Sequence, residues 1–246
     1  MYKYNRGLYE LHLDIESFKK ELIIKCKKFN IYYPIRFNSQ QDEDKYIIQC
    51  ILKDKIEDGI YLEIGAMDGV EYSNTKTLED YFNFTGILIE PQKKYFDLLV
   101  KNRPKSKCYN FAVTNKDDDS IEFIGNNGAG GAIHTMTDDF YDKYHKTNQT
   151  YQVKNKKMDE IIKESKFKYI DIMSIDVEGG ELELLKSIDF SFPIYCIIIE
   201  AHSDEQEKNK IFGNYLKKHG FTFKERQRGN EIWINHNYFR KHLFNS

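Results

Sequence analysis

The chain has 246 residues, a length that one α/β domain with an extension can fill. Its 37 basic and 39 acidic residues give a formal net charge of −2, and the scattered lysines and four widely spaced cysteines argue against a nucleic-acid surface and a zinc ribbon. No apolar run approaches the ~20 residues that span a bilayer, so we expect a cytoplasmic protein with neither a membrane nor a nucleic acid as partner.

Residues 1–58 are expected to form a helical extension packed on the main domain. Over residues 9–29, apolar positions recur among charged ones at near-helical spacing, which predicts a helix. The run Ser39-Gln-Gln-Asp-Glu-Asp44 could cap a second helix, expected over 45–55. The main domain, residues 59–246, follows.

Two strands and the helix between them open the main domain. The runs Ile60-Tyr-Leu-Glu-Ile-Gly-Ala-Met-Asp-Gly69 and Gly86-Ile-Leu-Ile-Glu-Pro91 each read as a buried strand and its turn, and the gap between them fits one crossover helix. In such a unit the first turn lets backbone N–H groups approach a ligand, and a carboxylate that ends the second strand can accept hydrogen bonds from both hydroxyls of a ribose. The unit therefore predicts half of a nucleoside-binding site.

The turn after the first strand indicates which nucleoside binds. A dinucleotide fold needs G-x-G-x-x-G, whereas this turn reads Glu63-x-Gly65-x-x-Asp68-Gly69, with two carboxylates and two glycines. Carboxylates are poor partners for phosphate but suit a ligand with a cationic end, and S-adenosylmethionine carries a sulfonium and an ammonium group. The missing third glycine makes an NAD-dependent oxidoreductase the weaker interpretation. An α/β fold with an incidental glycine-rich turn stays open at this point.

The rest of the chain alternates helices and strands. Residues 114–156 are less regular and hold a hairpin strand at 121–124 and a glycine-rich loop at 125–132. The other helices are expected at 93–101, 158–165, 181–187 and 204–219, and the other strands at 107–113, 169–176, 194–200, 221–225 and 231–235. This order predicts an α/β fold with a doubly wound, mostly parallel sheet of seven strands and helices on both faces.

Seven separated motifs resemble those of the FkbM-type methyltransferases, in the order expected for that family and over roughly residues 37–235. They are Ser39-Gln-x-x-Glu43-Asp44, Leu62-Glu-Ile-Gly-Ala-x-Asp-Gly-Val70 with Tyr72-Ser-Asn-Thr75, Ile89-Glu-Pro91, Asn102-Arg-Pro104, Asn110-Phe-Ala-Val113, Ser174-Ile-Asp-Val-Glu-Gly-x-Glu181 and Ile197-Ile-Ile-Glu200. One such motif would be weak evidence, whereas seven in register are strong.

The resemblance implies a class I methyltransferase, Rossmann-like in fold, that uses S-adenosylmethionine to methylate a hydroxyl. In characterised relatives the acceptor is often a sugar or a sugar-bearing small molecule, so we expect a glycan, or a nucleotide-sugar or glycoside precursor, as partner. Two positions depart from the family pattern. Met67 stands where a small polar residue is common, and Gly180 where a polar residue such as His is often found.

Most of the expected cofactor contacts lie near the two opening strands. Glu90 is expected to accept hydrogen bonds from both ribose hydroxyls, because a carboxylate matches a vicinal diol in geometry. Glu63 or Asp68 could engage the ammonium group, and N–H groups near Ser73 could meet the cofactor carboxylate, although helix capping alone would explain Ser73. The full expected set is Glu63, Gly65, Ala66, Asp68, Gly69, Ser73, Asn74, Glu90, Pro91, Ala112, Val113 and Asp176.

The candidate catalytic residues follow the two central strands. An aliphatic hydroxyl is too weak an acid to lose its proton unaided near neutral pH, so a nearby base should assist its attack on the methyl carbon. His202 titrates near neutrality, and Asp176 or Glu178 could act if apolar surroundings raised its pKa. A helix-opening role explains His202 as well as catalysis does. With Glu200 the two acidic residues could hold a divalent cation, but their spacing fits no fixed metal motif, so no metal site is predicted.

Three alternatives compete with a sugar methyltransferase. An RNA 2′-O-methyltransferase, acting on a cap or a ribose, would need a lysine near Glu200 within a Lys-Asp-Lys-Glu set and a basic groove, and neither is evident. An amino-directed enzyme would carry a Pro-Pro-aromatic run after Asp176, where Val-Glu-Gly stands. A non-catalytic S-adenosylmethionine-binding module stays open, because several methyltransferase folds bind without turnover.

Overall fold

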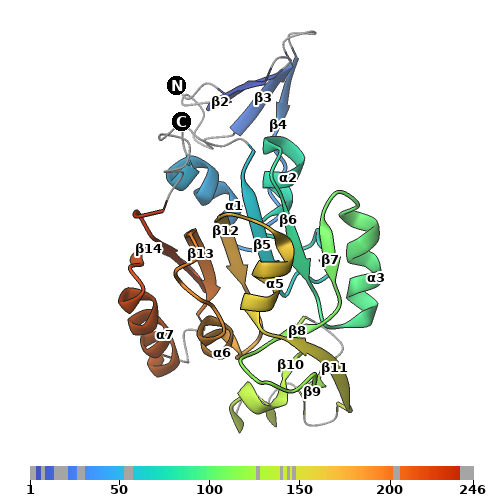
Figure 1. The fold of residues 1–246 in the computed structure, drawn as a ribbon. Helices are drawn as coiled ribbons and strands as arrows, with labels where there is room; N and C mark the ends of the chain where they lie inside the picture. Colours follow the sequence, from blue (N-terminus) through green and yellow to red (C-terminus); the bar gives the residue numbers. More distant parts are fainter. Residues whose placement is uncertain are drawn as a thin grey trace.

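The computed structural model shows a seven-stranded central sheet and two smaller sheets at opposite ends of it (Figure 1). It describes residues 4–6, 9–13, 22–26, 31–52, 58–125, 128–138, 141–142, 145, 148–201 and 206–238. In this described part, every helix is too short or too polar to cross a bilayer.

The central sheet has the strand order β14-β15-β13-β12-β5-β6-β7. Its strands are β5 (Ile60–Ile64), β6 (Thr85–Ile89), β7 (Lys107–Tyr109), β12 (Ile170–Ile175), β13 (Ile194–Glu200), β14 (Thr222–Gln227) and β15 (Asn230–Ile234). Strands β5, β6, β7, β12 and β13 run parallel to one another. Strand β15 is antiparallel to both β13 and β14. The prediction of a mostly parallel sheet of seven strands is confirmed. The sheet is mixed because a hairpin, which reverses the chain, joins its last two strands.

Each face of the sheet carries its own apolar core, because successive side chains of a strand point to opposite faces. Leu62 and Ile64 of β5 join one core, whereas Tyr61 joins the other. The first core is covered by α5 (Met158–Ser165), α6 (Glu181–Lys186) and α7 (Gln206–Lys218), and the second by α2 (Lys76–Phe82) and α3 (Lys93–Asn102). Helices therefore cover both faces, as predicted for a doubly wound sheet.

A second sheet lies at the carboxyl end of the parallel strands (Figure 1). It has the order β10-β9-β11-β8 and is built from β8 (Ala112–Val113), β9 (Ser120–Ile124), β10 (Gly131–Ala132) and β11 (Thr150–Lys156), with the short 3-10 helix η2 (Ile133–Thr135) after β10. The predicted hairpin strand at 121–124 is confirmed within β9. The predicted third strand over 107–113 is interrupted, because Asn110 Nδ2 donates to the carbonyl oxygens of Glu90 and Pro91, each at 2.9 Å, and β8 continues in the other sheet.

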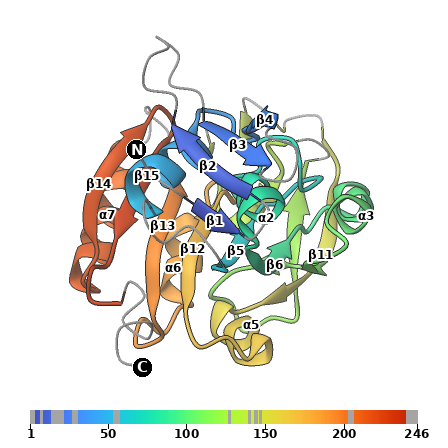
Figure 2. The same cartoon turned by 90° about the horizontal axis from the view of Figure 1, so that it is seen from above.

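In the N-terminal extension, residues 9–13 and 22–26 form strands of a sheet where a helix was predicted over residues 9–29, and the rest of that span lies outside the described residues. Strands β1 (Tyr4–Arg6), β2 (Tyr9–Leu13), β3 (Leu22–Cys26) and β4 (Ile31–Pro34) pair in sequence order and antiparallel. The prediction was wrong because Tyr9-Glu-Leu-His-Leu13 alternates with period two, and the later segments are rich in isoleucine and tyrosine, which favour strands. Figure 2 shows this small sheet from above, across one end of the molecule.

The second predicted helix of the extension exists, but it changes from an α-helix to a π-helix along its length. The helix α1 (Glu43–Tyr46) continues directly as the π-helix η1 (Ile47–Leu52). The remainder of the predicted span, residues 53–55, lies outside the described residues. Ser39 Oγ donates to Asp44 Oδ1 at 2.6 Å and accepts from the Asp44 N–H at 3.2 Å, so the predicted capping run does hold the start of this helix.

Candidate active site

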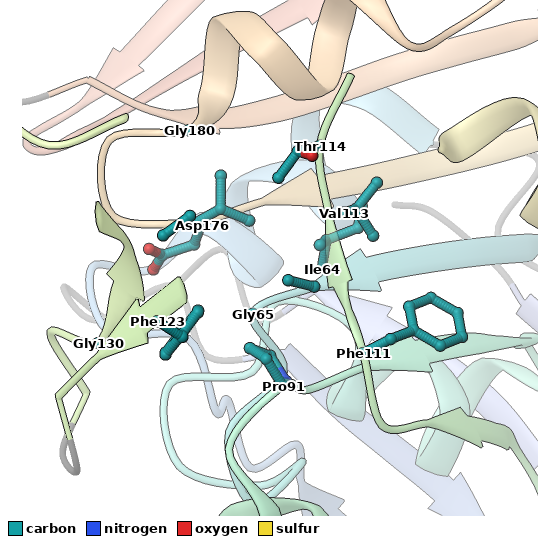
Figure 3. Close-up of a pocket in the computed structure, with 13 residues that line it drawn as sticks. Ile64, Gly65, Pro91, Phe111, Val113, Thr114, Phe123, Gly130, Asp176 and Gly180 are labelled. Atoms are coloured by element: carbon teal, nitrogen blue, oxygen red, sulfur yellow. The ribbon is translucent and has the colours of Figure 1, made fainter. Parts of the chain in front are cut away.

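A pocket opens where the carboxyl ends of β5, β6 and β12 meet the second sheet. Its volume is about 420 Å³ including its open mouth. The residues around it, shown in Figure 3, are Ile64, Gly65, Pro91, Phe111, Ala112, Val113, Thr114, Phe123, Gly130, Ala132, Asp176, Val177 and Gly180. The strand order reverses between β5 and β12, and ligands of open α/β sheets bind in the crevice at such a reversal.

The turn after β5 passes so close to β12 that only glycine fits at position 65. Gly65 has φ +82°, and a Cβ added to it would lie 1.7 Å from the carbonyl oxygen of Asp176. The N–H groups of Gly65 and Ala66 both donate to the carbonyl oxygen of Ile89 at 3.0 Å. Gly69, with φ +77°, packs on Leu99 in the same way. The turn is therefore fixed against both neighbouring strands at the floor of the pocket.

Glu63 is buried behind this turn and binds the loop that follows it. Its carboxylate accepts hydrogen bonds from Ser73 Oγ at 2.8 Å, Thr75 Oγ1 at 2.6 Å and the Asn74 N–H at 2.8 Å. Burial raises the pKa of Glu63, and the Arg103 guanidinium, 3.9 Å away, and these hydrogen bonds offset part of that rise. Glu63 is thus placed to hold the loop, and its predicted contact with the cofactor ammonium group stays a prediction.

Two other predicted contacts, Ser73 and Asp68, are used within the chain. Ser73 Oγ accepts from the N–H groups of Thr75 and Lys76, at 3.3 and 3.1 Å, which is the capping role that competed with cofactor binding. Asp68 Oδ1 accepts from the N–H groups of Val70 and Glu71, both at 2.8 Å. The structure brings neither side chain to the wall of the pocket.

Asn74 differs from its neighbours because it keeps an unused acceptor. Its Nδ2 donates to Ser174 Oγ at 2.9 Å, which ties the loop to β12 two residues before Asp176. Its Oδ1 is buried and has no hydrogen-bond partner among the described residues. Buried polar atoms are nearly always paired, so this oxygen is an exception, although Asn74 is not among the residues that line the pocket.

Glu90 ends β6 beneath the second sheet and is 2% exposed. One carboxylate oxygen accepts from the Met67 N–H at 2.9 Å and the other from the Gln92 N–H at 2.8 Å. Each oxygen keeps capacity for one more hydrogen bond. Burial raises the pKa of Glu90 to about 7, against the lowering effect of these two donors. Burial, followed by the negative charge of Glu90, also raises the pKa of the neighbouring Tyr151 to about 12.

The end of the interrupted third strand lines the pocket, as predicted for Ala112 and Val113. The sequence did not single out Phe111 and Thr114 beside them. It also missed a wall from the second sheet, made of Phe123, Gly130 and Ala132. The glycine-rich loop at 125–132 was the one available signal, and it indicated a functional loop without indicating what the loop covers.

Three carboxylates gather beside the pocket. Asp176, Glu178 and Glu200 can each direct an oxygen so that the three atoms lie within 4.8 Å of one another, a spacing that could also hold one cation. Asp176 is exposed to the pocket but surrounded by protein, so desolvation, then Glu200 and Glu178, raises its pKa well above the usual range. The structure thus brings Asp176 and Glu178 together, and their catalytic role stays a prediction. His202 lies outside the described residues.

A family model described as the methyltransferase FkbM domain matches residues 63–223, more than half of the chain, from the first buried glutamate of β5 into β14. No curated protein matches the chain.

Several solved structures are similar to this one at low sequence identity. Fibrillarin from Aeropyrum pernix, in complex with natively bound S-adenosyl-L-methionine, aligns with TM-score 0.44 and 11% identity over 95% of this chain and 98% of that chain. Precorrin-6y C5,15-methyltransferase from Geobacter metallireducens aligns with TM-score 0.42 and 11% identity over 72% and 80%. The N-terminal domain of human METTL16 in complex with SAH aligns with TM-score 0.43 and 13% identity over 78% and 67%.

Proposed function

The chain belongs to the FkbM family of methyltransferases, and from this premise we propose that it transfers the methyl group of S-adenosylmethionine to a hydroxyl of a sugar. The acceptor is a glycan or a nucleotide-sugar or glycoside precursor, as the resemblance to sugar-modifying relatives implies. The observation that carries the proposal is the pocket at the carboxyl ends of β5, β6 and β12, with three carboxylates beside it. We place the reaction in the cytoplasm, in keeping with the free thiols of Cys50, Cys108 and Cys196.

The residues of the pocket fit S-adenosylmethionine. This cofactor, when bound, supplies a methyl group that an oxygen nucleophile can attack. The apolar side chains of Phe111, Val113 and Phe123 in the pocket wall suit a flat adenine ring. Glu90 is not itself a lining residue but directly precedes Pro91 of the wall, and its carboxylate matches the two ribose hydroxyls. The unpaired Oδ1 of Asn74 would accept from the ammonium group of the cofactor. The carboxylates near Asp176 suit its positive charge.

Asp176 is the residue we propose as general base. A carboxylate with an ordinary pKa is a weak base, and the raised pKa of Asp176 brings it closer to the working range of a base near neutral pH. Desolvation, followed by the charges of Glu200 and Glu178, keeps that pKa high. Asp176 is also the one carboxylate of the three that lines the pocket. His202 stays a predicted alternative for this role.

The three carboxylates of Asp176, Glu178 and Glu200 could also hold a divalent cation, although the sequence predicts no metal site. Turnover that survives dialysis against EDTA, and is not raised by added Mg²⁺, would support the role of Asp176 as an unassisted base. Turnover that needs the added ion would instead give these carboxylates the role of ligands.

Binding of the cofactor is the first test of the proposed function. Calorimetric titration with S-adenosylmethionine should show one saturable site, which Glu90→Ala weakens and the exposed control Glu71→Ala leaves unchanged. No saturable binding, or binding that Glu90→Ala does not affect, would remove the enzyme assignment.

Methyl transfer to a panel of acceptors tests the second half of the proposal. Tritiated S-adenosylmethionine is incubated with free sugars, nucleotide-sugars, capped RNA and peptides, and label should appear on a sugar-containing compound. Label on RNA alone would defeat the sugar assignment and favour the RNA 2′-O-methyltransferase. Cofactor binding without transfer to any acceptor would favour a non-catalytic module.

A further inference from the structure

A second cavity lies between α7 and the hairpin of β14 and β15, and it shares no lining residue with the pocket described above. It is an open groove of about 740 Å³. Its walls are polar and aromatic, and are formed by Gln206, Asn209, Lys210, Gly213, Asn214, Lys217, Phe223, Arg226, Glu231 and Trp233. None of these residues was assigned a role by the motifs of the sequence.

The groove is positively charged once its internal ion pair is counted. Glu231 is the one carboxylate among its lining residues, and both of its oxygens are occupied. Oε1 lies 3.2 Å from Arg226 Nη1, and Oε2 accepts from Trp233 Nε1 at 3.0 Å. Among the described residues, no carboxylate forms an ion pair with Lys210 or Lys217. These two ammonium groups are therefore available to an anionic ligand.

The two lysines define the length of that ligand. They are seven residues apart on α7, which is two helical turns, so both lie on one side of the helix and about 10 Å apart along it. A ligand that meets both ammonium groups along the groove is longer than a single small anion. An oligosaccharide with acidic groups on more than one unit has that form.

One exposed ring gives the groove a flat surface. Phe223 is 44% exposed, an unusual state for a phenylalanine that neighbours a buried tryptophan. Its ring packs edge-on against Trp233, with centroids 5.5 Å apart and planes at 74°. Lys217 Nζ lies 6.0 Å from the Trp233 ring on the same wall. An exposed, fixed aromatic ring beside amides and cations is a surface on which the apolar face of a sugar ring can pack.

The groove reaches the edge of the sheet that carries the three carboxylates. Arg226 Nη2 donates to the carbonyl oxygen of Ala201, the residue directly after Glu200. Gln206 and Asn209, in the first turns of α7, line the same end of the groove. A ligand lying along α7 therefore ends near the proposed methyl-transfer point.

From these contacts we infer that the groove binds the non-reacting part of an anionic oligosaccharide acceptor, with uronate or phosphate groups on Lys210 and Lys217 and a sugar ring on Phe223. Because it takes the occupant to be the methyl acceptor, this inference rests on the sugar methyltransferase function proposed above. Saccharide binding at the groove can nevertheless be measured without methyl transfer. Its failure and that of the proposed function are thus separable.

Saccharide binding to the full chain, measured by calorimetry at low salt, tests the groove. Tetragalacturonate should bind at least tenfold more tightly than the neutral maltotetraose. The double variant K210E/K217E should weaken tetragalacturonate binding at least tenfold and leave maltotetraose binding unchanged. The control K218E/K101E changes the net charge equally at two exposed lysines outside the groove and should have little effect.

A second pair of variants tests the aromatic surface. Phe223→Ala should weaken both saccharides, whereas Ile211→Ala, at a 52% exposed position of α7 outside the groove, should weaken neither. Asp176→Asn should reduce transfer by about 10²–10⁴-fold and keep saccharide binding. Equal affinity for the two tetrasaccharides, or tetragalacturonate binding unaffected by K210E/K217E, would overturn the inference. A uridine decanucleotide RNA that binds the groove more tightly than tetragalacturonate would overturn it in favour of RNA.

Discussion

Arg103 Nη1 donates a hydrogen bond of 2.9 Å to the carbonyl oxygen of Gly69, in the turn that forms the floor of the pocket. The arginine is fully buried, and its other donors reach Tyr61 Oη at 2.8 Å and Thr75 Oγ1 at 3.1 Å. Its Nε lies 3.1 Å from Glu79 Oε2. One planar group thus joins the start of β5, the turn and the following helix, which a flexible ammonium group could not do with the same geometry.

Removal of Arg103 should destabilise the fold and loosen the turn after β5 that contains Gly65 and Gly69. Arg103→Met leaves the buried carboxylates of Glu63 and Glu79 without their partner, so the free energy of unfolding in urea should fall by about 3–5 kcal/mol. Arg103→Lys, which restores the charge but not the fork of donors, should recover only part of that loss. Arg228→Met, at an exposed position, is the control. An equal loss of unfolding free energy in the two Met variants would contradict a stabilising role for the buried contacts of Arg103.

Cofactor affinity should rise with pH through the titration of Glu90. The ribose hydroxyls are donors, so they favour the ionised carboxylate, and a pKa of about 7 leaves this group mostly protonated below neutrality. If only the ionised form binds, affinity at pH 6 should be about tenfold weaker than its plateau above pH 8. Calorimetric titration between pH 6 and pH 8.5 measures this change in cofactor affinity. Glu90→Gln should remove the pH dependence and Glu71→Gln should keep it; a flat profile for the unaltered protein would argue against ribose binding at Glu90.

The rate of methyl transfer should rise with pH through the titration of Asp176. A general base must be ionised, so the rate falls as pH drops below its raised pKa. Glu200→Gln removes a neighbouring negative charge, so it should lower the pKa of Asp176 and move the rising limb of the pH–rate profile to lower pH. Asp176→Asn should reduce turnover by about 10²–10⁴-fold and affect cofactor binding less. Two results together would assign the base to His202: a rising limb of the pH–rate profile that Glu200→Gln does not move, and loss of turnover in His202→Ala.

The middle of the central sheet was predictable because strands such as β12 and β13 are buried on both faces, unlike the outer strands β7 and β14. Such strands read as unbroken apolar runs, and Ile170–Ile175 has no exposed residue. The strands of the N-terminal sheet are short and mix charged with apolar residues. Over segments as short as Tyr9–Leu13, periods of two and of 3.6 are hard to tell apart, and pairing with the next strand, β3, decided the outcome.

The pocket was predictable only where it follows the motifs. Gly65, Pro91 and Asp176 line it because strand ends of a parallel sheet meet at one edge. Phe123 reaches it through the pairing of β9 with β11, a contact between distant segments that no local pattern encodes. Ser73 is the reverse case, a motif residue that does not line the pocket. A motif gives the residue type but does not say which neighbour its hydroxyl will bind.

Gly65 offers the sharpest test of the close approach between β5 and β12. Gly65→Ala places a methyl group 1.7 Å from the carbonyl oxygen of Asp176, at a φ of +82° that alanine rarely adopts, so the backbone of one strand end must move. We expect a lower thermal midpoint and loss of both cofactor binding and turnover. Gly128→Ala is the matched control, because its added Cβ meets only Met67, at 3.6 Å, and should leave all three quantities nearly unchanged. Full cofactor affinity in Gly65→Ala would mean that the turn can move away from Asp176 without disturbing the pocket.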